Sequence, residues 1–128
     1  MKLLIDSHVL IWYLDPEMGL PDHIGAQLED ANGAVFVSAA TAWEVTTKFR
    51  IGKLPQAAEL ARRFPEIVMG CGFQPLPITL EHGYVAGSLD GEHRDPFDRM
   101  LAAQARVERL PIVSRDPVFD ALGVERIW

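Results

Sequence analysis

The sequence has a single cysteine, Cys71, so it can form no internal disulfide and offers no cysteine cluster for zinc. It also lacks any apolar run approaching the roughly 20 residues of a membrane-spanning helix. The apolar start at residues 1–5 is typical of a signal peptide, but Asp6 and His8 interrupt it and no small-residue cleavage site follows. These absences predict a cytoplasmic protein that does not bind a membrane.

Basic residues are scarce, because 12 lysines and arginines stand against 18 acids and leave a formal net charge of −6. A chain of this net charge does not hold nucleic acid through bulk positive charge. The charge still allows a nuclease whose acidic residues bind a metal ion. The bases are also unevenly distributed, and most of those before residue 64 lie in residues 48–63: Lys48, Arg50, Lys53, Arg62 and Arg63. A phosphate backbone is one candidate partner for this stretch, and a solvated helix face is the alternative for Arg62 and Arg63.

The chain shows no repeat, linker or low-complexity segment, and its 128 residues, 48% of them hydrophobic, suit one domain over residues 1–128. Short apolar runs predict strands at 2–5, 34–37, within 73–78, 110–113 and 124–127. Periodicity and punctuation predict helices at 9–14, 21–31, 38–51, 54–68 with a break at Pro65, 79–86, 96–109 and 117–122. This alternation predicts an α/β domain with a central, mostly parallel sheet of four to five strands.

The segment His93–Leu101 carries two carboxylates, Asp95 and Asp98, at the start of a predicted helix. Pro96 suits the first helical position, and an aspartate just before it is a favoured N-cap. Two carboxylates at one helix start can share a divalent cation such as Mg2+. Taken alone, however, the structural interpretation is favoured, in which Asp95 caps the helix and Asp98 faces the positive end of its dipole.

Two further aspartates follow predicted strands. Asp6 ends the first strand. Asp116 follows the strand at 110–113 and precedes a proline, as Asp95 does. Ligands of open α/β sheets bind at the carboxyl ends of the strands, so both positions suit a binding site. The alternative for Asp6 is that it caps the next helix. His8 is interpreted as a helix-face residue, because no second histidine lies at metal-binding spacing.

Glu44 has two interpretations, depending on where its helix begins. Thr41 to Glu44 match a capping box, which would make the glutamate structural. If Ser38 is the N-cap, Glu44 lies nearly two turns inside the helix and needs another explanation. The sequence favours the start at Ser38.

Together, these acids are predicted to converge on one end of the sheet, where mutual repulsion would raise their pKa values. A divalent metal would relieve that repulsion. Ligands that are all oxygen favour Mg2+ or Mn2+ over zinc, and such ions serve in phosphoryl chemistry.

Several short segments, in this order and spacing, resemble the PIN-domain family, and within it the VapC-type toxin ribonucleases of bacterial type II toxin–antitoxin systems. They are Leu4–His8, Val37–Ala40 with Trp43–Glu44, Lys48 with Gly52–Leu54, His93–Arg99 and Val113–Asp116. The resemblance implies a three-layer α/β/α fold and a metal-dependent endoribonuclease. That enzyme would hydrolyse RNA phosphodiester bonds by metal-activated water and leave 5′-phosphate and 3′-hydroxyl ends.

The resemblance also implies roles for individual residues. Metal ligation, with Mg2+ or Mn2+ as cofactor, and catalysis fall on Asp6, Glu44, Asp98 and Asp116, with Asp95 as a further acid beside them. Glu44 would complete the metal shell or orient the attacking water. Ser7 and Ser114 would be supporting hydroxyls. The expected partners are RNA, a small antitoxin protein whose tail occupies the groove, and a second copy of the chain in a homodimer.

The candidate RNA contacts are Lys48, Arg50, Lys53, Arg94 and Arg99. A non-catalytic PIN-fold module that binds RNA or protein is the alternative function, but such a module is expected to have lost one or more acids. A phosphohydrolase of the haloacid-dehalogenase type is disfavoured, because Asp6–His8 lacks the paired aspartates of that class.

Overall fold

The computed structural model describes residues 1–128 and contains a five-stranded sheet with all strands parallel. The strands are β1 (Lys2–Ile5), β2 (Ala34–Ser38), β3 (Gln74–Leu76), β4 (Ile112–Val113) and β5 (Arg126–Ile127), in the order β3-β2-β1-β4-β5. The predicted α/β fold is therefore confirmed. Because β1 is central and the chain adds strands on both sides of it, the sheet has a switch in strand order beside β1, where such sheets bind ligands.

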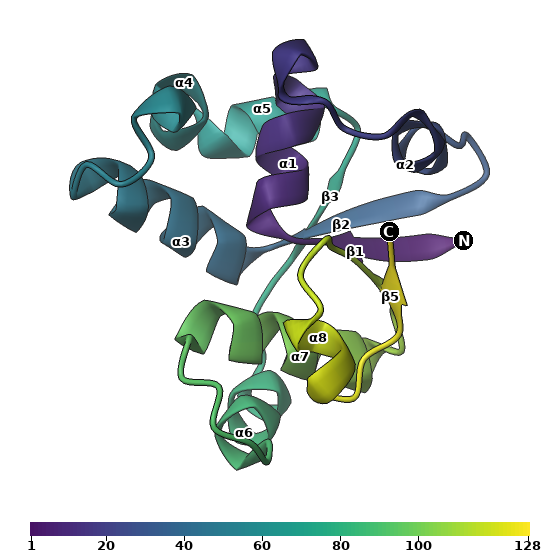
Figure 1. Cartoon of the computed structure of the whole chain (residues 1–128), viewed down its shortest axis with the longest axis vertical. Coiled ribbons are helices and arrows are strands. Elements are labelled where there is room, and N and C mark those ends of the chain that lie inside the picture. Colours follow the sequence, from purple (N-terminus) through teal and green to yellow (C-terminus); the bar gives the residue numbers. More distant parts are fainter.

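Helices cover both faces of the sheet and make three layers (Figure 1). One face carries α1 (Ser7–Leu14), α2 (Asp22–Leu28), α3 (Ala39–Arg50), α4 (Ala58–Arg62) and α5 (Phe64–Gly70). The other carries α6 (Leu80–Ser88), α7 (Pro96–Glu108) and α8 (Val118–Ala121). Two short 3-10 helices, η1 (Pro16–Met18) and η2 (Pro55–Ala57), lie in the connections. None of these helices combines the length and the apolar character needed to cross a bilayer.

The central strand β1 explains why its sequence is a continuous apolar run. Leu3 and Ile5 pack into the core on the face of α1 to α5, whereas Leu4 packs into the second core beneath α6 to α8. All three are almost fully buried. A parallel strand covered on both faces has no solvent-facing position, so alternation of polar and apolar residues disappears.

The predicted helix at 54–68 is three shorter pieces. The 3-10 helix η2 leads into α4, and the chain leaves helical geometry at Arg63 before α5 begins at Phe64. The predicted break at Pro65 is confirmed, because proline cannot continue a helix but fits the first turn of a new one, where its missing N–H is not needed.

Helices α6 and α7 are joined by His82, which the sequence analysis did not single out. Thr79, at the predicted start of this helix, caps α6, and the Thr79 N–H donates to Nδ1 of His82 at 3.0 Å in a reciprocal capping box. The other ring nitrogen, Nε2, lies 3.1 Å from Glu108 Oε1 on α7. A fully buried imidazole thus has a partner on each side and links the two helices.

The start of α3 decides between the two interpretations of Glu44. Ser38 is the N-cap, and its Oγ accepts the Ala40 N–H at 2.9 Å. The hydroxyl of Thr41 is buried without a hydrogen-bond partner, so it does not cap. Glu44 is consequently the sixth residue of the helix, and the capping-box interpretation is wrong.

Ser38→Ala is expected to lower the free energy of unfolding by about 1 kcal/mol, because it removes the acceptor for an N–H of the first helical turn. Thr41→Ala is the matched control, since its hydroxyl forms no hydrogen bond to be lost. Urea denaturation followed by circular dichroism measures both values. A larger loss for Thr41→Ala than for Ser38→Ala would contradict this assignment of the cap.

Candidate functional site

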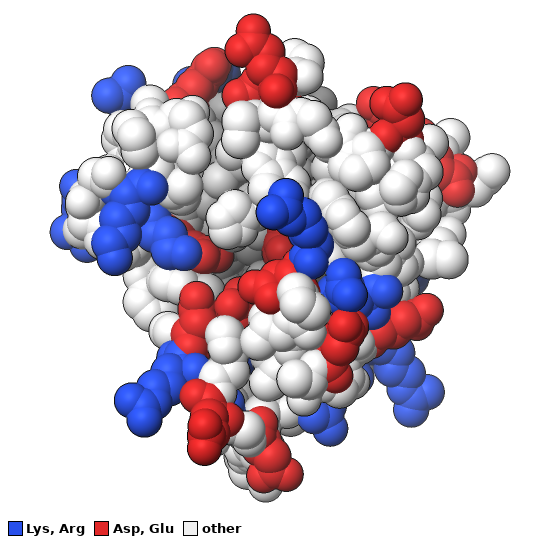
Figure 2. All heavy atoms as spheres, in the orientation of Figure 1, with Lys and Arg blue, Asp and Glu red and all other residues white.

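Four carboxylates from four different elements meet at the carboxyl edge of the sheet. Asp6 follows β1 directly, Asp116 follows β4, Glu44 lies on α3 after β2, and Asp98 lies in the first turn of α7. Because the strands are parallel, their carboxyl ends lie at the same edge. In Figure 2 acidic atoms gather in a hollow near the middle of the face shown, with basic atoms along its rim.

Asp6 both caps α1 and belongs to this cluster. Its Oδ1 accepts the Val9 N–H at 2.9 Å, and its Oδ2 accepts the hydroxyl hydrogen of Ser114. Burial raises the pKa of Asp6, the two hydrogen bonds and His8 lower it, and the charge of Glu44 raises it. The net shift of the pKa is upward, because ionising a buried carboxylate is unfavourable.

Ser114 joins Asp6 to Asp116. Its fully buried hydroxyl donates to Asp6 and accepts the Asp116 N–H at 3.0 Å. Asp116 in turn accepts the Val118 N–H at 3.0 Å through Oδ1, which organises the start of α8. The other predicted supporting hydroxyl, Ser7, is a buried residue at the first position of α1, next to Asp6 in the chain.

Glu44 is buried with only one of its carboxylate oxygens paired. Its side chain is 4% exposed, and Oε2 forms an ion pair with Lys48 one turn later on α3. The other oxygen, Oε1, is buried and has no hydrogen-bond partner. Burial acts to lower the pKa of Lys48, but the bond to Glu44 and the charges of Asp95 and Asp98 together raise it. Lys48 therefore stays protonated among acids that it only partly neutralises.

Asp98 is a partly buried acid of the cluster, in the first turn of α7. The pKa of Asp98 is raised to about 6, mainly by burial, which the hydrogen bond from His93 opposes and to which the charges of Asp95 and Glu44 add. His93 Nε2 lies 2.9 Å from Asp98 Oδ2. Asp95 caps α7 through Oδ1, which accepts the N–H groups of Phe97 at 2.9 Å and Asp98 at 3.3 Å.

His93 belongs to the site, although no role was predicted for it from the sequence. Ligand atoms of His93, Asp95 and Asp98 lie within 4.8 Å of one another, so they could contact one ion. The sequence feature that could have indicated this role is the position of His93, five residues before Asp98 in the same short segment. Whether its ring faced the carboxylate depended on the path of the connecting loop, which local sequence does not define.

Arg99 holds that loop in place. Its Nε donates to the carbonyl oxygen of Ala86 at 3.1 Å, Nη1 donates to that of His93 at 3.1 Å, and Nη2 donates to that of Leu89. These bonds fix the connection between α6 and α7 onto the first turn of α7. The guanidinium predicted to contact RNA is thus used within the fold.

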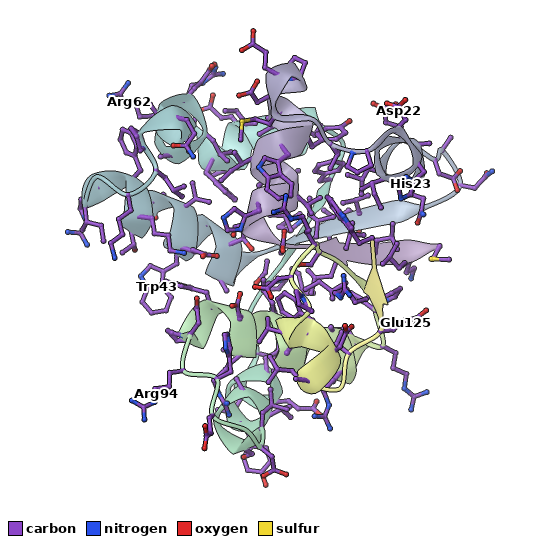
Figure 3. The ribbon with its side chains drawn as sticks, viewed as in Figure 1. Asp22, His23, Trp43, Arg62, Arg94 and Glu125 are labelled. Carbon is purple, nitrogen blue, oxygen red and sulfur yellow. The ribbon has the colours of Figure 1, made fainter.

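The remaining basic candidates differ in their surroundings. Arg50, Lys53 and Arg94 are exposed, and Arg94 points away from the body of the protein in Figure 3. Arg62 lies over the Phe49 ring with its Cζ 5.6 Å from the ring centroid. Arg63, between α4 and α5, forms ion pairs with Glu59 on α4 and Glu66 on α5. Arg62 and Arg63 therefore fit the solvated-face interpretation.

The cluster meets the chemical requirements of a divalent cation site. Glu44 Oε1 is a buried oxygen without a partner, and burial makes ionisation of Asp6 and Asp98 costly. A divalent ion would supply the missing partner and favour the charged form of each acid. The donors are carboxylate oxygens with one imidazole nearby, a set that suits Mg2+ or Mn2+.

Comparison with known proteins gives consistent results. The family model for the PIN domain matches residues 3–125. The chain is also 35% identical over 57 residues to Ribonuclease VapC16 of Mycobacterium tuberculosis. That alignment covers 44% of the chain and only 40% of the relative, so the chain aligns with less than half of that protein's length.

Two solved structures share the fold over nearly the whole chain. VapBC2 from Rickettsia felis, bound to a DNA fragment from its promoter, has a TM-score of 0.72 at 14% identity and covers 99% of this chain and 98% of that one. A toxin–antitoxin complex from Klebsiella pneumoniae has a TM-score of 0.64 at 17% identity and covers 98% and 96%. At these identities the likeness concerns the fold.

The raised pKa of Asp98 predicts that the metal-free protein loses stability as the pH rises from about 4 to about 6. In this window the folded state retains a proton that the unfolded chain, with an ordinary aspartate pKa of 3.8, has already released. Asp98→Asn should flatten the fall in the free energy of unfolding. Urea unfolding in chelator between pH 4 and 7 measures it, with Asp90→Asn at an exposed aspartate as control. An equal fall in both variants would contradict the prediction.

Proposed function

Since the chain belongs to the PIN domain family, we propose that it is a metal-dependent endoribonuclease and the toxin of a toxin–antitoxin pair. The observation that carries the proposal is the convergence of Asp6, Glu44, Asp98 and Asp116 from four elements on one edge of the sheet. Two of them have raised pKa values, which a divalent cation would reverse. An acidic cation site of this kind suits the hydrolysis of phosphodiesters.

Each acid has a proposed role that its surroundings support. Asp6, Asp98 and Asp116 are proposed to hold the cation, and Asp95 is a further acid with a ligand atom within 4.8 Å of those of Asp98 and His93. When bound, Mg2+ or Mn2+ neutralises phosphate charge and lowers the pKa of water. Glu44 offers a free oxygen that can complete the ligand set or accept a proton.

The neighbours of these acids fix where the carboxylates point. Ser114 donates a hydrogen bond to Asp6, and His93 lies within hydrogen-bond distance of Asp98. Lys48 balances one of the charges through its ion pair with Glu44. Such supporting partners orient ligands and hold their reactive atoms in place.

RNA is proposed to approach along the basic end of α3, where Lys48 lies against the acids and Arg50 and Lys53 are exposed nearby. Arg94, exposed on the loop before α7, is a further proposed contact. Arg99 is left out of this set because its guanidinium donates to three carbonyl groups. Contacts of this kind supply the phosphate attraction that an acidic protein otherwise lacks.

The proposed protein partners are an antitoxin and a second copy of the chain. Large apolar side chains remain exposed near the start of α6 and on α3, including Trp43 at 61% and Leu80 at 93%. Exposed apolar surface of this kind is typical of proteins that associate. The proposed RNA substrate places the activity in the cytoplasm.

Incubation of the purified chain with single-stranded RNA tests the proposal. Cleavage is expected with Mg2+ or Mn2+, to be lost in chelator, and to leave 5′-phosphate and 3′-hydroxyl ends that sequencing of the fragments identifies. Asp98→Asn should lower the rate at least about 100-fold, since loss of even an outer-shell partner often costs 10- to 100-fold. Asp95→Asn, a change of the same chemistry three residues away, should lower it less.

One result would contradict the ranking of the two acids, and another would contradict the proposed activity. Equal losses in the two variants would mean that Asp95 and Asp98 are wrongly ranked within the site. Tight RNA binding without cleavage in either metal would instead indicate a non-catalytic module of the same fold.

A further inference from the structure

A groove of roughly 340 Å³ opens beside the acids, and no residue of α3 or α7 lines it. It is lined by Asp6, His8, Trp12, Arg115, Asp116 and Pro117. Its volume lies within the range of small-molecule sites, about 300–1,000 Å³. Part of its lining is therefore formed by the proposed catalytic carboxylates Asp6 and Asp116. Another part is formed by the aromatic and basic side chains of His8, Trp12 and Arg115.

Trp12 supports the other two members of that group. The His8 ring centroid lies 5.7 Å from that of Trp12, and the Arg115 Cζ lies 5.6 Å from the Trp12 centroid. Trp12 itself packs against Trp128, at a centroid distance of 5.8 Å, and against the core. A partly buried indole thus holds two exposed planar groups at the groove.

Arg115 has no structural partner other than this ring. It takes part in none of the ion pairs of the chain, although Asp116 is its neighbour. The packing of Trp12 on Trp128 and the core does not require Arg115 or His8. An exposed contact between a cation and a ring contributes only about 0.5–1 kcal/mol, so the Arg115 guanidinium is held weakly and its outer face stays open to a ligand.

We propose that His8, Trp12 and Arg115 form a subsite on which one base of single-stranded RNA stacks, next to the phosphate that is cleaved. The inference rests on the proposed function, since it takes RNA as the substrate. Unpaired bases stack on aromatic rings and on guanidinium planes. Within a duplex both faces of each base are already covered, so the subsite selects for single strands.

The planar side chains of the groove favour a base over a phosphate as the group bound there. A base can lie against the guanidinium plane of Arg115 and the ring of His8, whereas a tetrahedral phosphate has no flat face to stack. Binding a base beside the acids also places the adjoining phosphate near them, since neighbouring groups of one nucleotide are covalently joined. The subsite thereby positions the substrate for cleavage.

The test uses an RNA oligonucleotide cleaved at one mapped bond, and copies that lack the base on one or the other side of that bond. Removing the base that stacks should lower kcat/KM of the unmodified protein at least about fivefold. Arg115→Ala should cause a similar loss on the intact oligonucleotide and little further loss on the abasic copy. Arg115→Lys should not restore the rate, because lysine keeps the charge but has no plane to stack. His8→Ala should cause a smaller loss of the same kind.

Arg62→Ala is the matched control, because Arg62 lies over Phe49 with the same Cζ-to-centroid distance of 5.6 Å but on α4, away from the acids (Figure 3). It should leave kcat/KM unchanged. Full rescue by Arg115→Lys, or equal cleavage of the intact and both abasic oligonucleotides, would overturn the subsite while leaving the nuclease activity established. Absence of cleavage of every oligonucleotide would overturn the proposed function, and the subsite with it.

Discussion

Burial of several like-charged carboxylates at one edge of a parallel sheet is the constraint on which the site depends. The topology brings Asp6 and Asp98 into surroundings where ionisation is costly, and burial is the largest cause of both raised pKa values. Lys48 and His93 offset part of that cost, but Glu44 keeps an unpaired buried oxygen. The chain itself does not neutralise this set of acids, and the proposed cation would do so.

The same acids also determine the local structure that positions them. Asp6 caps α1, Asp95 caps α7, and Asp116 accepts an N–H at the start of α8. Each of these contacts uses one carboxylate oxygen. The second oxygen of Asp6 accepts the Ser114 hydroxyl, and the second oxygens of Asp95 and Asp116 remain unpaired. The structural and functional interpretations of these aspartates are therefore compatible, and a helix-start pattern in the sequence does not argue against a role at a metal site.

Features determined by neighbours in the chain could be predicted from the sequence. The strands appear as apolar runs, and the caps at Ser38 and Asp95 follow from local hydrogen bonding. The pairing of His93 with Asp98 and the stacking of Arg115 on Trp12 could not be predicted in this way. Both depend on loop paths and rotamers that only the packed structure specifies, and a basic residue in the sequence does not indicate whether it faces RNA or holds a loop.

Crystals grown with Mn2+ would test the cation site most directly, because anomalous scattering locates the ion without reference to any activity. The account predicts an Mn2+ ion bound by oxygens of Asp6 and Asp98, with Asp116 or Glu44 completing the protein ligands. An ion bound at another place, or no ion at saturating Mn2+ with the four carboxylates placed as they are here, would contradict it.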